Sequence, residues 1–318
     1  MAIGEFALIE KYFTGIGHSS HIDLGVGDDC ALITPPAGHQ LAISVDTLVA
    51  DVHFPALGNP ELIAQKALRS NLSDLAAMGA QPLAFTLALT LPNSNEKWLA
   101  AFSRGLRACA QEFDIALIGG DTTRGPQHVI TIQVMGSIPN GSALTRSGAN
   151  VGDIIFITGT LGDARAALDY LSTPMQKLNK AQQFFLQRYY TPTPRVQFAQ
   201  SLRGIANSAI DISDGLSADL THILERSNVG AQIELENLPI STALKIHNDA
   251  QQFALHGGDD YELCFTAAKS RVEEITALAQ KFSIPITAIG EIFKDSGLFA
   301  RANGNLQPII SAGYTHFS

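Results

Sequence analysis

The chain carries little charge and little cysteine for its length. Only 16% of its 318 residues are charged and 46% are hydrophobic, so the composition excludes wholesale disorder and favours a sizeable core. Lysine and arginine number 21 against 30 aspartates and glutamates, which gives a net charge of −9. This shortage of positive charge disfavours binding to nucleic acid or to an anionic membrane surface. It is compatible with acidic residues that bound cations partly neutralise.

The three cysteines are Cys30, Cys109 and Cys264, and no two of them have Cys-x-x-Cys spacing. Their odd number and spacing argue against a disulfide framework and a thiolate zinc site, and they fit a reducing cytoplasm. The N-terminal segment lacks the basic start and the uninterrupted apolar run of a signal peptide. The longest apolar segment, residues 83–92, is too short to span a bilayer. We expect a cytoplasmic protein with no membrane partner.

Several nucleotide and metal motifs are also missing. The sequence has no Gly-x-x-x-x-Gly-Lys-[Ser/Thr] loop and no full Gly-x-Gly-x-x-Gly, so P-loop and Rossmann sites are disfavoured. It has no Gly-x-Ser-x-Gly elbow and no His-Glu-x-x-His, and the spacing of His53, His222 and His256 does not suit zinc. If a nucleotide binds, metal ions and backbone groups must hold it in place of a Walker lysine.

Short β-like runs alternate with helical patterns, which predicts an α/β (α+β) protein. A small, polar stretch at 139–153 predicts a boundary between two domains, 1–138 and 150–318. Helices are expected at 1–13, 60–78, 96–112, 164–171, 216–226 and 272–282. Strands are expected at 41–46, 83–91, 115–118, 129–138, 154–157, 208–212, 231–235, 261–266 and 286–292.

Aspartates gather at the edges of these elements. They are Asp28, Asp29, Asp46, Asp74, Asp121, Asp211 and Asp214, several with glycine beside them. Hard divalent cations such as Mg²⁺ take oxygen ligands, and glycine lets the backbone approach a phosphate closely. Most of these motifs also have a plain structural interpretation: a turn at 27–29, helix N-caps at 213–214, or an exposed helix face at 71–74. Asp211 ends an apolar strand, where an unpaired carboxylate is costly, and this favours a functional role for it. For the other positions the residues alone leave both interpretations open.

Taken in order, seven motifs resemble the thiamine-monophosphate kinases, a family of the aminoimidazole-ribonucleotide-synthetase-like superfamily. They are GDDCA (27–31), SVDTLVADVHF (44–54), NLSDLAAMGA (71–80), IGGDTT (118–123), LTRSGANVGD (144–153), DISDGLSADL (211–220) and GGDDYEL (257–263). The similarity covers essentially the whole chain. Each motif is weak alone, and seven in this order are very specific.

The resemblance implies a homodimer of two-domain chains in which the N-terminal domains pair. It implies transfer of the ATP γ-phosphoryl group to thiamine monophosphate, giving thiamine diphosphate, with several Mg²⁺ ions. The domain 1–138 would bind ATP and Mg²⁺ and form the dimer, and 150–318 would complete the active site. The residues that match Mg²⁺ ligands are Asp29, Ser44, Val45, Asp46, Asp74, Asp121, Asp211 and Asp214. Those that match ATP contacts are Gly120, Asp121, Arg146 and Ser213, and those that match thiamine-phosphate contacts are His53, Glu262 and Phe317.

Two positions depart from the family pattern. Val45 stands where threonine is frequent, so only its backbone carbonyl could serve a metal. Asp259 stands where glutamate is usual. Neither position alters the main set of carboxylates.

The implied reaction explains why such carboxylates would be needed. The acceptor is a phosphate monoester that is largely ionised near neutral pH, so we assign no general base. Two unit charges 4 Å apart repel by about 4 kcal/mol at an effective dielectric near 20, and Mg²⁺ held by aspartates would cancel this repulsion. We therefore interpret Gly119 and Gly120 as room for a phosphate at the end of a strand, and Asp121 as a metal ligand supported by Thr122 and Thr123.

Two alternatives stay open. The first is another ATP-dependent enzyme of the superfamily, such as selenophosphate synthetase, the hydrogenase maturation factor or the purine-pathway synthetase. The missing N-terminal reactive cysteine or selenocysteine and the missing C-terminal cysteine argue against the first two, and the pairs 53–54 and 261–262 argue against the third. The second alternative is a non-catalytic protein that binds a divalent metal or a nucleotide.

Overall fold

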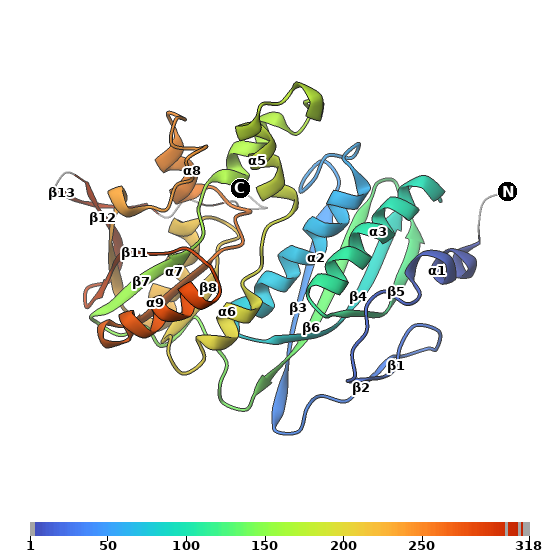
Figure 1. The fold of residues 1–318 in the computed structure, drawn as a ribbon, viewed down its shortest axis with the longest axis horizontal. Coiled ribbons are helices and arrows are strands. Elements are labelled where there is room, and N and C mark those ends of the chain that lie inside the picture. The colour runs from blue at the N-terminus through green and yellow to red at the C-terminus, as the bar shows by residue number, and fades with distance from the viewer. Residues whose placement is uncertain (1–3, 303–304, 311–312, 314–318) are drawn as a thin grey trace. The chain divides into compact units, whose positions relative to one another are not determined.

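The computed structural model describes residues 4–302, 305–310 and 313 (Figure 1). The chain forms two compact units. Unit 1 comprises Met1–Leu75 and Ala80–Gly141, and unit 2 comprises Ala76–Gly79 and Ser142–Ser318. Within the described ranges, no helix is long and apolar enough to cross a membrane.

Unit 1 is a four-stranded sheet with helices on one face (Figure 1). The strand order is β3-β6-β4-β5; β4 and β5 are parallel and the other neighbours are antiparallel. A separate two-stranded sheet pairs β1 with β2. In chain order the elements are α1 (Glu5–Phe13), β1 (Ile22–Leu24), β2 (Leu32–Ile33), β3 (His39–Val49), α2 (Pro60–Ala77), β4 (Gln81–Leu91), α3 (Glu96–Glu112), β5 (Ala116–Arg124) and β6 (Val129–Pro139).

Local sequence signals start the two long helices of unit 1. The Asn59 side chain accepts a hydrogen bond from Glu61 N, and Pro60 occupies the first helical position of α2. Asn95 caps α3 by accepting from two backbone N–H groups. The two helices approach closely, because a β-carbon at Gly105 of α3 would lie 2.1 Å from the carbonyl oxygen of Glu61. Glycine at this position is therefore a packing requirement.

The two faces of this sheet differ in burial. Leu48, Phe85, Leu87, Ile132 and Val134 point to the helix-covered face and are buried. The opposite face of β3 carries Leu41, Ile43 and Val45, which are 41%, 58% and 54% exposed. We call this second surface the open face.

A β-bulge interrupts the pairing of β4 with β5. Leu117 pairs with Phe85 and Gly119 pairs with Thr86, so Ile118 is the extra residue. Beyond the bulge Asp121 pairs with Ala88, which lies on the open face and is exposed. The bulge therefore determines which face of the sheet Asp121 occupies, because a shift of one residue reverses side-chain direction.

Unit 2 is built on a seven-stranded sheet with the order β13-β12-β9-β11-β7-β10-β8. Among the described strands of this sheet, only β12 and β9 pair in parallel. Its strands are β7 (Asp153–Thr158), β8 (Ser208–Asp211), β9 (Gly230–Glu234), β10 (Leu263–Ala268), β11 (Ile286–Phe293), β12 (Gly297–Ala302) and β13 (Asn305–Pro308). Its α-helices are α4 (Asp163–Ala167), α5 (Lys180–Tyr190), α6 (Val196–Ser201), α7 (Leu216–Ser227), α8 (Ala250–His256) and α9 (Val272–Lys281).

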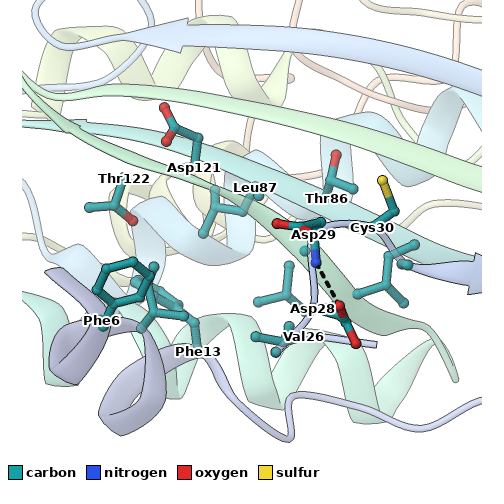
Figure 2. Close-up of a pocket in the computed structure, with 17 residues that line it drawn as sticks. Phe6, Phe13, Val26, Asp28, Asp29, Cys30, Thr86, Leu87, Asp121 and Thr122 are labelled. Atoms are coloured by element: carbon teal, nitrogen blue, oxygen red, sulfur yellow. Dashed lines mark hydrogen bonds between the residues drawn. The ribbon is translucent and has the colours of Figure 1, made fainter. Parts of the chain in front are cut away.

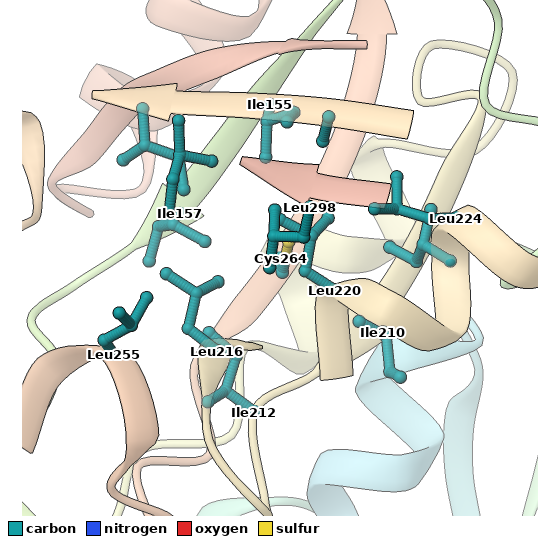
Figure 3. Close-up of a cluster of buried hydrophobic side chains, with 14 of the residues drawn as sticks. Ile155, Ile157, Ile210, Ile212, Leu216, Leu220, Leu224, Leu255, Cys264 and Leu298 are labelled. Carbon is teal, nitrogen blue, oxygen red and sulfur yellow. The ribbon is translucent and has the colours of Figure 1, made fainter. Parts of the chain in front are cut away.

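Apolar side chains cover both faces of the unit 2 sheet. On one face Leu216, Leu220 and Leu224 of α7 join Ile155 and Cys264 of the strands in one buried cluster (Figure 3). On the other face the Phe198 ring of α6 lies 6.1 Å from Phe265 of β10 and 6.2 Å from Phe282, which follows α9. The buried cluster on the first face anchors α7 against the sheet.

The predicted fold class is confirmed, and several predicted boundaries are wrong. The stretch Gly119–Asp121 was expected at a strand end and lies inside β5, which continues to Arg124. Asp46 was also expected at a strand end, but β3 continues to Val49. The short helices α5, α6 and α8 and the strands β1, β2, β12 and β13 were not predicted.

Candidate functional site

A cavity of about 580 Å³ opens beside β5 in unit 1 (Figure 2). Residues 26–31 form one wall, residues 117–122 of β5 form another, and α1 contributes Phe6 and Phe13. The cavity therefore combines an apolar side with a side that carries the carboxylates of Asp28, Asp29 and Asp121. Such a mixture suits a ligand with a flat apolar part and a charged part.

The two glycines of β5 differ in what an added side chain would contact. A β-carbon at Gly120 would lie 1.9 Å from the carbonyl oxygen of Leu87, so the pairing of β4 and β5 requires glycine there. A β-carbon at Gly119 would meet no described atom within 4 Å, and Gly119 lines the cavity. Gly119 therefore leaves open backbone at the cavity and Gly120 serves the sheet, while the predicted contact with a phosphate stays a prediction.

The loop 27–29 presents two adjacent carboxylates. Asp29 N donates a hydrogen bond to Asp28 Oδ1 at 3.1 Å (Figure 2), and both side chains are exposed. The backbone of Gly27 has φ 130°, a conformation that L side chains rarely adopt. This glycine permits the turn that brings Asp29 to the cavity wall.

The remaining predicted metal ligands of unit 1 meet where β3 contacts α2. Ser44 Oγ donates to Asp74 Oδ2 at 2.5 Å, and Asp46 N donates to Asn71 Oδ1 at 3.2 Å. Asn71 is fully buried, and its amide donates to the carbonyl of Ala67 at 2.9 Å. Asn71 thus joins α2 to β3 through its side-chain hydrogen bonds, which explains why a poor helix former stands at this position.

Unit 1 keeps its predicted metal ligands in two groups. Ser44 and Asp46 pair with Val134 and Ile132 and point to the helix-covered face, whereas Asp121 points to the open face. β3 and β5 are the outer strands, separated by three strand spacings, or about 14 Å. Within the described residues no group of three or more His, Cys, Asp or Glu side chains is arranged to hold a metal ion. One copy of unit 1 does not bring the two groups together.

The donor atoms of both groups fit Mg²⁺ in kind. They are the carboxylates of Asp29, Asp46, Asp74 and Asp121 and the hydroxyl of Ser44, and these are the hard oxygen ligands that Mg²⁺ prefers. The 2.5 Å bond between Ser44 and Asp74 places a hydroxyl and a carboxylate close enough to share one cation. No soft or imidazole donor is needed. The residues present therefore fit a magnesium site that more than one element supplies.

His53 lies in a tight loop after β3. Its Nδ1 accepts a hydrogen bond from Val49 N at 3.0 Å, and the backbone N–H of His53 donates to the carbonyl of Val49 at 2.9 Å. A ring nitrogen that accepts carries no proton, so the proton of the neutral ring is on Nε2. The loop therefore fixes both the position and the tautomer of His53.

In unit 2, Asp211 ends β8, and Ser213 and Asp214 follow in the loop before α7. The carboxylate of Asp219 in α7 accepts the N–H groups of Ser213, Asp214 and Gly215, each at 3.1 Å. Burial and the nearby charge of Asp214 raise the pKa of Asp219 to about 7, and the three N–H donors oppose this rise. The loop that carries Ser213 and Asp214, two predicted site residues, is thus tied to a buried carboxylate.

Glu262 lies at the centre of a buried ionic cluster in unit 2. It is 1% exposed; Oε1 accepts from Arg188 at 2.9 Å and from Arg195 at 2.7 Å, and Oε2 accepts from Arg195 at 2.6 Å and from Thr158 at 2.7 Å. Burial disfavours the charged guanidinium of Arg188, but the surrounding carboxylates, Glu262 first among them, outweigh burial and raise its pKa. Both carboxylate oxygens of Glu262 are thus held by protein groups.

Two residues that were predicted to contact ligands remain: one is exposed at the surface, and the other is outside the described residues. Arg146 is exposed, and its carbonyl accepts from Ser227 Oγ at 3.3 Å. Phe317 lies outside the described residues. Their predicted roles in binding ATP and thiamine phosphate stay predictions.

Sequence reasoning missed Asp219, Arg188 and Arg195. Asp219 is part of the motif DISDGLSADL, and an acid in the first turn of a helix was the available signal. Arg188 and Arg195 lie in the segment between α4 and β8, where no element was predicted, and nothing in their spacing indicates a pair. Only the fold brings them to Glu262.

Both halves of the chain match a known pair of domains. Residues 27–138 match the N-terminal domain of AIR synthase related protein, and residues 150–303 match its C-terminal domain. The thiamine-monophosphate kinase of Escherichia coli (strain K12) is 46% identical over 324 residues, which cover 100% of this chain and 99% of that protein.

Solved structures agree with the sequence comparison. The crystal structure of the thiamine-monophosphate kinase from Stenotrophomonas maltophilia K279a has a TM-score of 0.84 and 45% identity, covering 90% of this chain and 93% of that one. A structure described as AaThiL complexed with AMPPCP and TMP has a TM-score of 0.81 and 28% identity, covering 100% and 99%. The chain belongs to the thiamine-monophosphate kinase family and is a kinase.

Proposed function

We propose that the chain transfers the γ-phosphoryl group of ATP to thiamine monophosphate, giving thiamine diphosphate and ADP. The observation that carries this proposal is the cavity beside β5, where Asp29 and Asp121 lie next to the open backbone of Gly119. The full-length similarity to thiamine-monophosphate kinases supports it, as does a related structure described with AMPPCP and TMP.

Mg²⁺ is part of the proposal, because the aspartates around the cavity would otherwise repel a polyphosphate. When bound, it would offset the negative charge of the transferred phosphoryl group and its neighbours. The residues that would hold it are Asp29, Ser44, the carbonyl of Val45, Asp46, Asp74, Asp121, Asp211 and Asp214. Gly120, Asp121, Arg146 and Ser213 would contact ATP.

The acceptor would be held by His53, Glu262 and Phe317. Nε2–H of His53 is a donor of fixed orientation, and a donor suits the phosphate of thiamine monophosphate. Because Arg188 and Arg195 occupy the oxygens of Glu262, this carboxylate would act within an ionic cluster that is already formed. No general base is assigned, since the attacking phosphate oxygen is ionised.

The active form in this proposal is a homodimer. Residues 1–138 pair and bind ATP and Mg²⁺, and residues 150–318 complete the site. The separation of Asp46 and Asp121 on opposite faces of one sheet supports a second copy, which could supply the missing group. The exposed apolar side chains of Leu41, Ile43 and Val45 support pairing through the open face. A cytoplasmic location stays a prediction from the cysteine content.

The test is ADP release by the purified protein in a coupled assay, with and without thiamine monophosphate and with and without EDTA. We expect release only with acceptor and magnesium, with thiamine diphosphate as product by chromatography. Asp46→Asn and Asp121→Asn should abolish turnover, whereas Asp169→Asn, which alters an exposed aspartate paired with Arg165, should not. Arg146→Ala should raise the KM for ATP.

Other outcomes would favour the alternatives. ADP release that ignores thiamine monophosphate would indicate a different ATP-dependent member of the superfamily. Stabilisation by Mg²⁺ without consumption of ATP would indicate a binding protein. Near-normal kcat in Asp46→Asn or Asp121→Asn at saturating Mg²⁺ would refute the metal role of that residue.

A further inference from the structure

Backbone hydrogen bonds join one side of the loop before α7 to residues 259–262. Ile212 N donates to the carbonyl of Glu262, Tyr261 N donates to that of Ile212, and Asp259 N donates to that of Ser213, each at 2.8 Å. A β-carbon at Gly258 would lie 2.3 Å from the carbonyl oxygen of Ser213. The segment 258–262 therefore lies directly against the loop and limits its movement in that direction.

Asp219 holds the other side of the same loop. Its Oδ2 accepts three consecutive N–H groups, those of residues 213–215, and its side chain is buried with 3% of the residue exposed. N–H groups just before a helix have no partner within the helix. The carboxylate of Asp219 supplies a partner for all three.

The helix that carries Asp219 is itself anchored. Leu216, Leu220 and Leu224 of α7 lie in the buried cluster against the sheet (Figure 3). Asp219 N donates to the carbonyl of Gly215 at 3.0 Å, so the acceptor and the loop are joined twice. A residue on a rigid, packed helix can hold a loop in one conformation more precisely than a residue on another loop.

We propose that Asp219 is a positioning residue for phosphoryl transfer. Its carboxylate fixes the backbone of residues 213–215 and so sets the direction of the Ser213 and Asp214 side chains, which would meet nucleotide and metal. Asp219 is buried, so it acts through these neighbours. This inference rests on the function proposed above for the loop.

Two substitutions test the inference. Asp219→Ala removes the acceptor, and Asp219→Asn keeps an amide oxygen in nearly the same volume. Misplacement of reacting groups by about 1 Å can cost about 100-fold in rate. We therefore expect Asp219→Ala to lower kcat/KM for ATP about 100-fold, and Asp219→Asn to retain at least about a tenth of the normal value. Hydrogen exchange of the amides of residues 213–215 should accelerate in Asp219→Ala.

A stability control separates positioning from general loss of structure. Ser208 starts β8, the strand that ends at Asp211, and its hydroxyl lies 2.7 Å from that of Thr266. Both residues are fully buried, so Ser208→Ala should lower the urea midpoint without touching the loop. At equal loss of stability, Ser208→Ala should keep normal kcat/KM and normal exchange at residues 213–215.

Three results would overturn the inference: unchanged kcat/KM in Asp219→Ala, an equal loss in Ser208→Ala, or unchanged amide exchange in Asp219→Ala. If the unaltered protein makes no thiamine diphosphate, the proposed function fails instead. Calorimetric titration with AMPPCP and Mg²⁺ then replaces kcat/KM. A dissociation constant at least about tenfold weaker in Asp219→Ala supports positioning, and equal constants overturn it.

Discussion

Substitution of each glycine in the pair Gly119–Gly120 should separate the binding role of β5 from its structural role. The two residues are adjacent and share one strand, so each variant controls for the other. At Gly120 the added methyl group would lie 1.9 Å from the carbonyl oxygen of Leu87, and at Gly119 it would meet no described atom within 4 Å. The same chemical change is therefore expected to lower stability at Gly120 and not at Gly119.

The expected magnitudes follow from these distances. A non-bonded contact needs roughly 3.5 Å, so Gly120→Ala must push β4 and β5 apart by more than about 1 Å. Overpacking costs about 1–3 kcal/mol, and each weakened backbone hydrogen bond adds about 1 kcal/mol, which together lower the unfolding free energy by about 3 kcal/mol or more. Gly119→Ala should leave it unchanged or raise it by up to about 1 kcal/mol, because alanine loses less backbone entropy.

Ligand binding should show the reverse order of sensitivity. The methyl group of Gly119→Ala would occupy the cavity next to Asp121, where the proposal places a phosphate of ATP. We expect at least about a tenfold weaker dissociation constant for AMPPCP with Mg²⁺, equivalent to about 1.4 kcal/mol. Urea denaturation measures the first effect and calorimetry the second. Normal AMPPCP affinity in a stable Gly119→Ala would refute the phosphate role, and normal stability in Gly120→Ala would refute the pairing argument.

Three further predictions concern assembly, packing and pH. Ile43→Glu should convert a dimer to a monomer in analytical ultracentrifugation, whereas Leu57→Glu, at a fully exposed position, should not. Gly105→Ala should lower the unfolding free energy by about 1–2 kcal/mol in urea, because overpacking against Glu61 exceeds the gain of about 1 kcal/mol in helix propensity; an increase would contradict this. Burial raises the pKa of Asp260 well above its ordinary value, so ionisation costs stability as pH rises from the unfolded pKa near 4 through the folded one. The unfolding free energy of Asp260→Asn relative to the unaltered protein should therefore increase with pH, and a constant difference would exclude this explanation.

The long helices of unit 1 were predictable because their signals are local. Asn59 and Pro60 begin α2, Asn95 begins α3, and the apolar spacing continues through both helices. A comparable signal was available for α5, where Asn179 and Gln182 form a capping box, but it was not used. Short helices with one such signal are the elements most easily overlooked.

The ends of β3 and β5 were not predictable from local propensity. Gly119, Gly120 and Asp121 favour a turn when considered alone, and pairing with β4 overrides that preference. The sequence indicates the types of candidate site residue, since clustered aspartates suit Mg²⁺. Their partners were not, because Asn71 and Asp219 act through backbone N–H groups that only the fold brings near.

The bulge at Ile118 shows why the direction of a site residue depends on packing several residues away. With regular pairing Asp121 would oppose Leu89 on the helix-covered face, where an unpaired carboxylate is costly. Ile118 is buried against Ala84 and Met135 on the open face. The extra residue places both Ile118 and Asp121 on that face, so the isoleucine is buried and the carboxylate stays off the helix-covered face.

Deletion of Ile118 would test this account of the bulge. Without Ile118 the pairing of Gly119 with Thr86 becomes regular, so Asp121 keeps its face while the buried isoleucine is lost. We expect a loss of about 2–5 kcal/mol in unfolding free energy, with AMPPCP binding retained by the folded fraction. Loss of binding in a folded deletion variant would mean that the bend of the bulge, in addition to the register, positions Asp121.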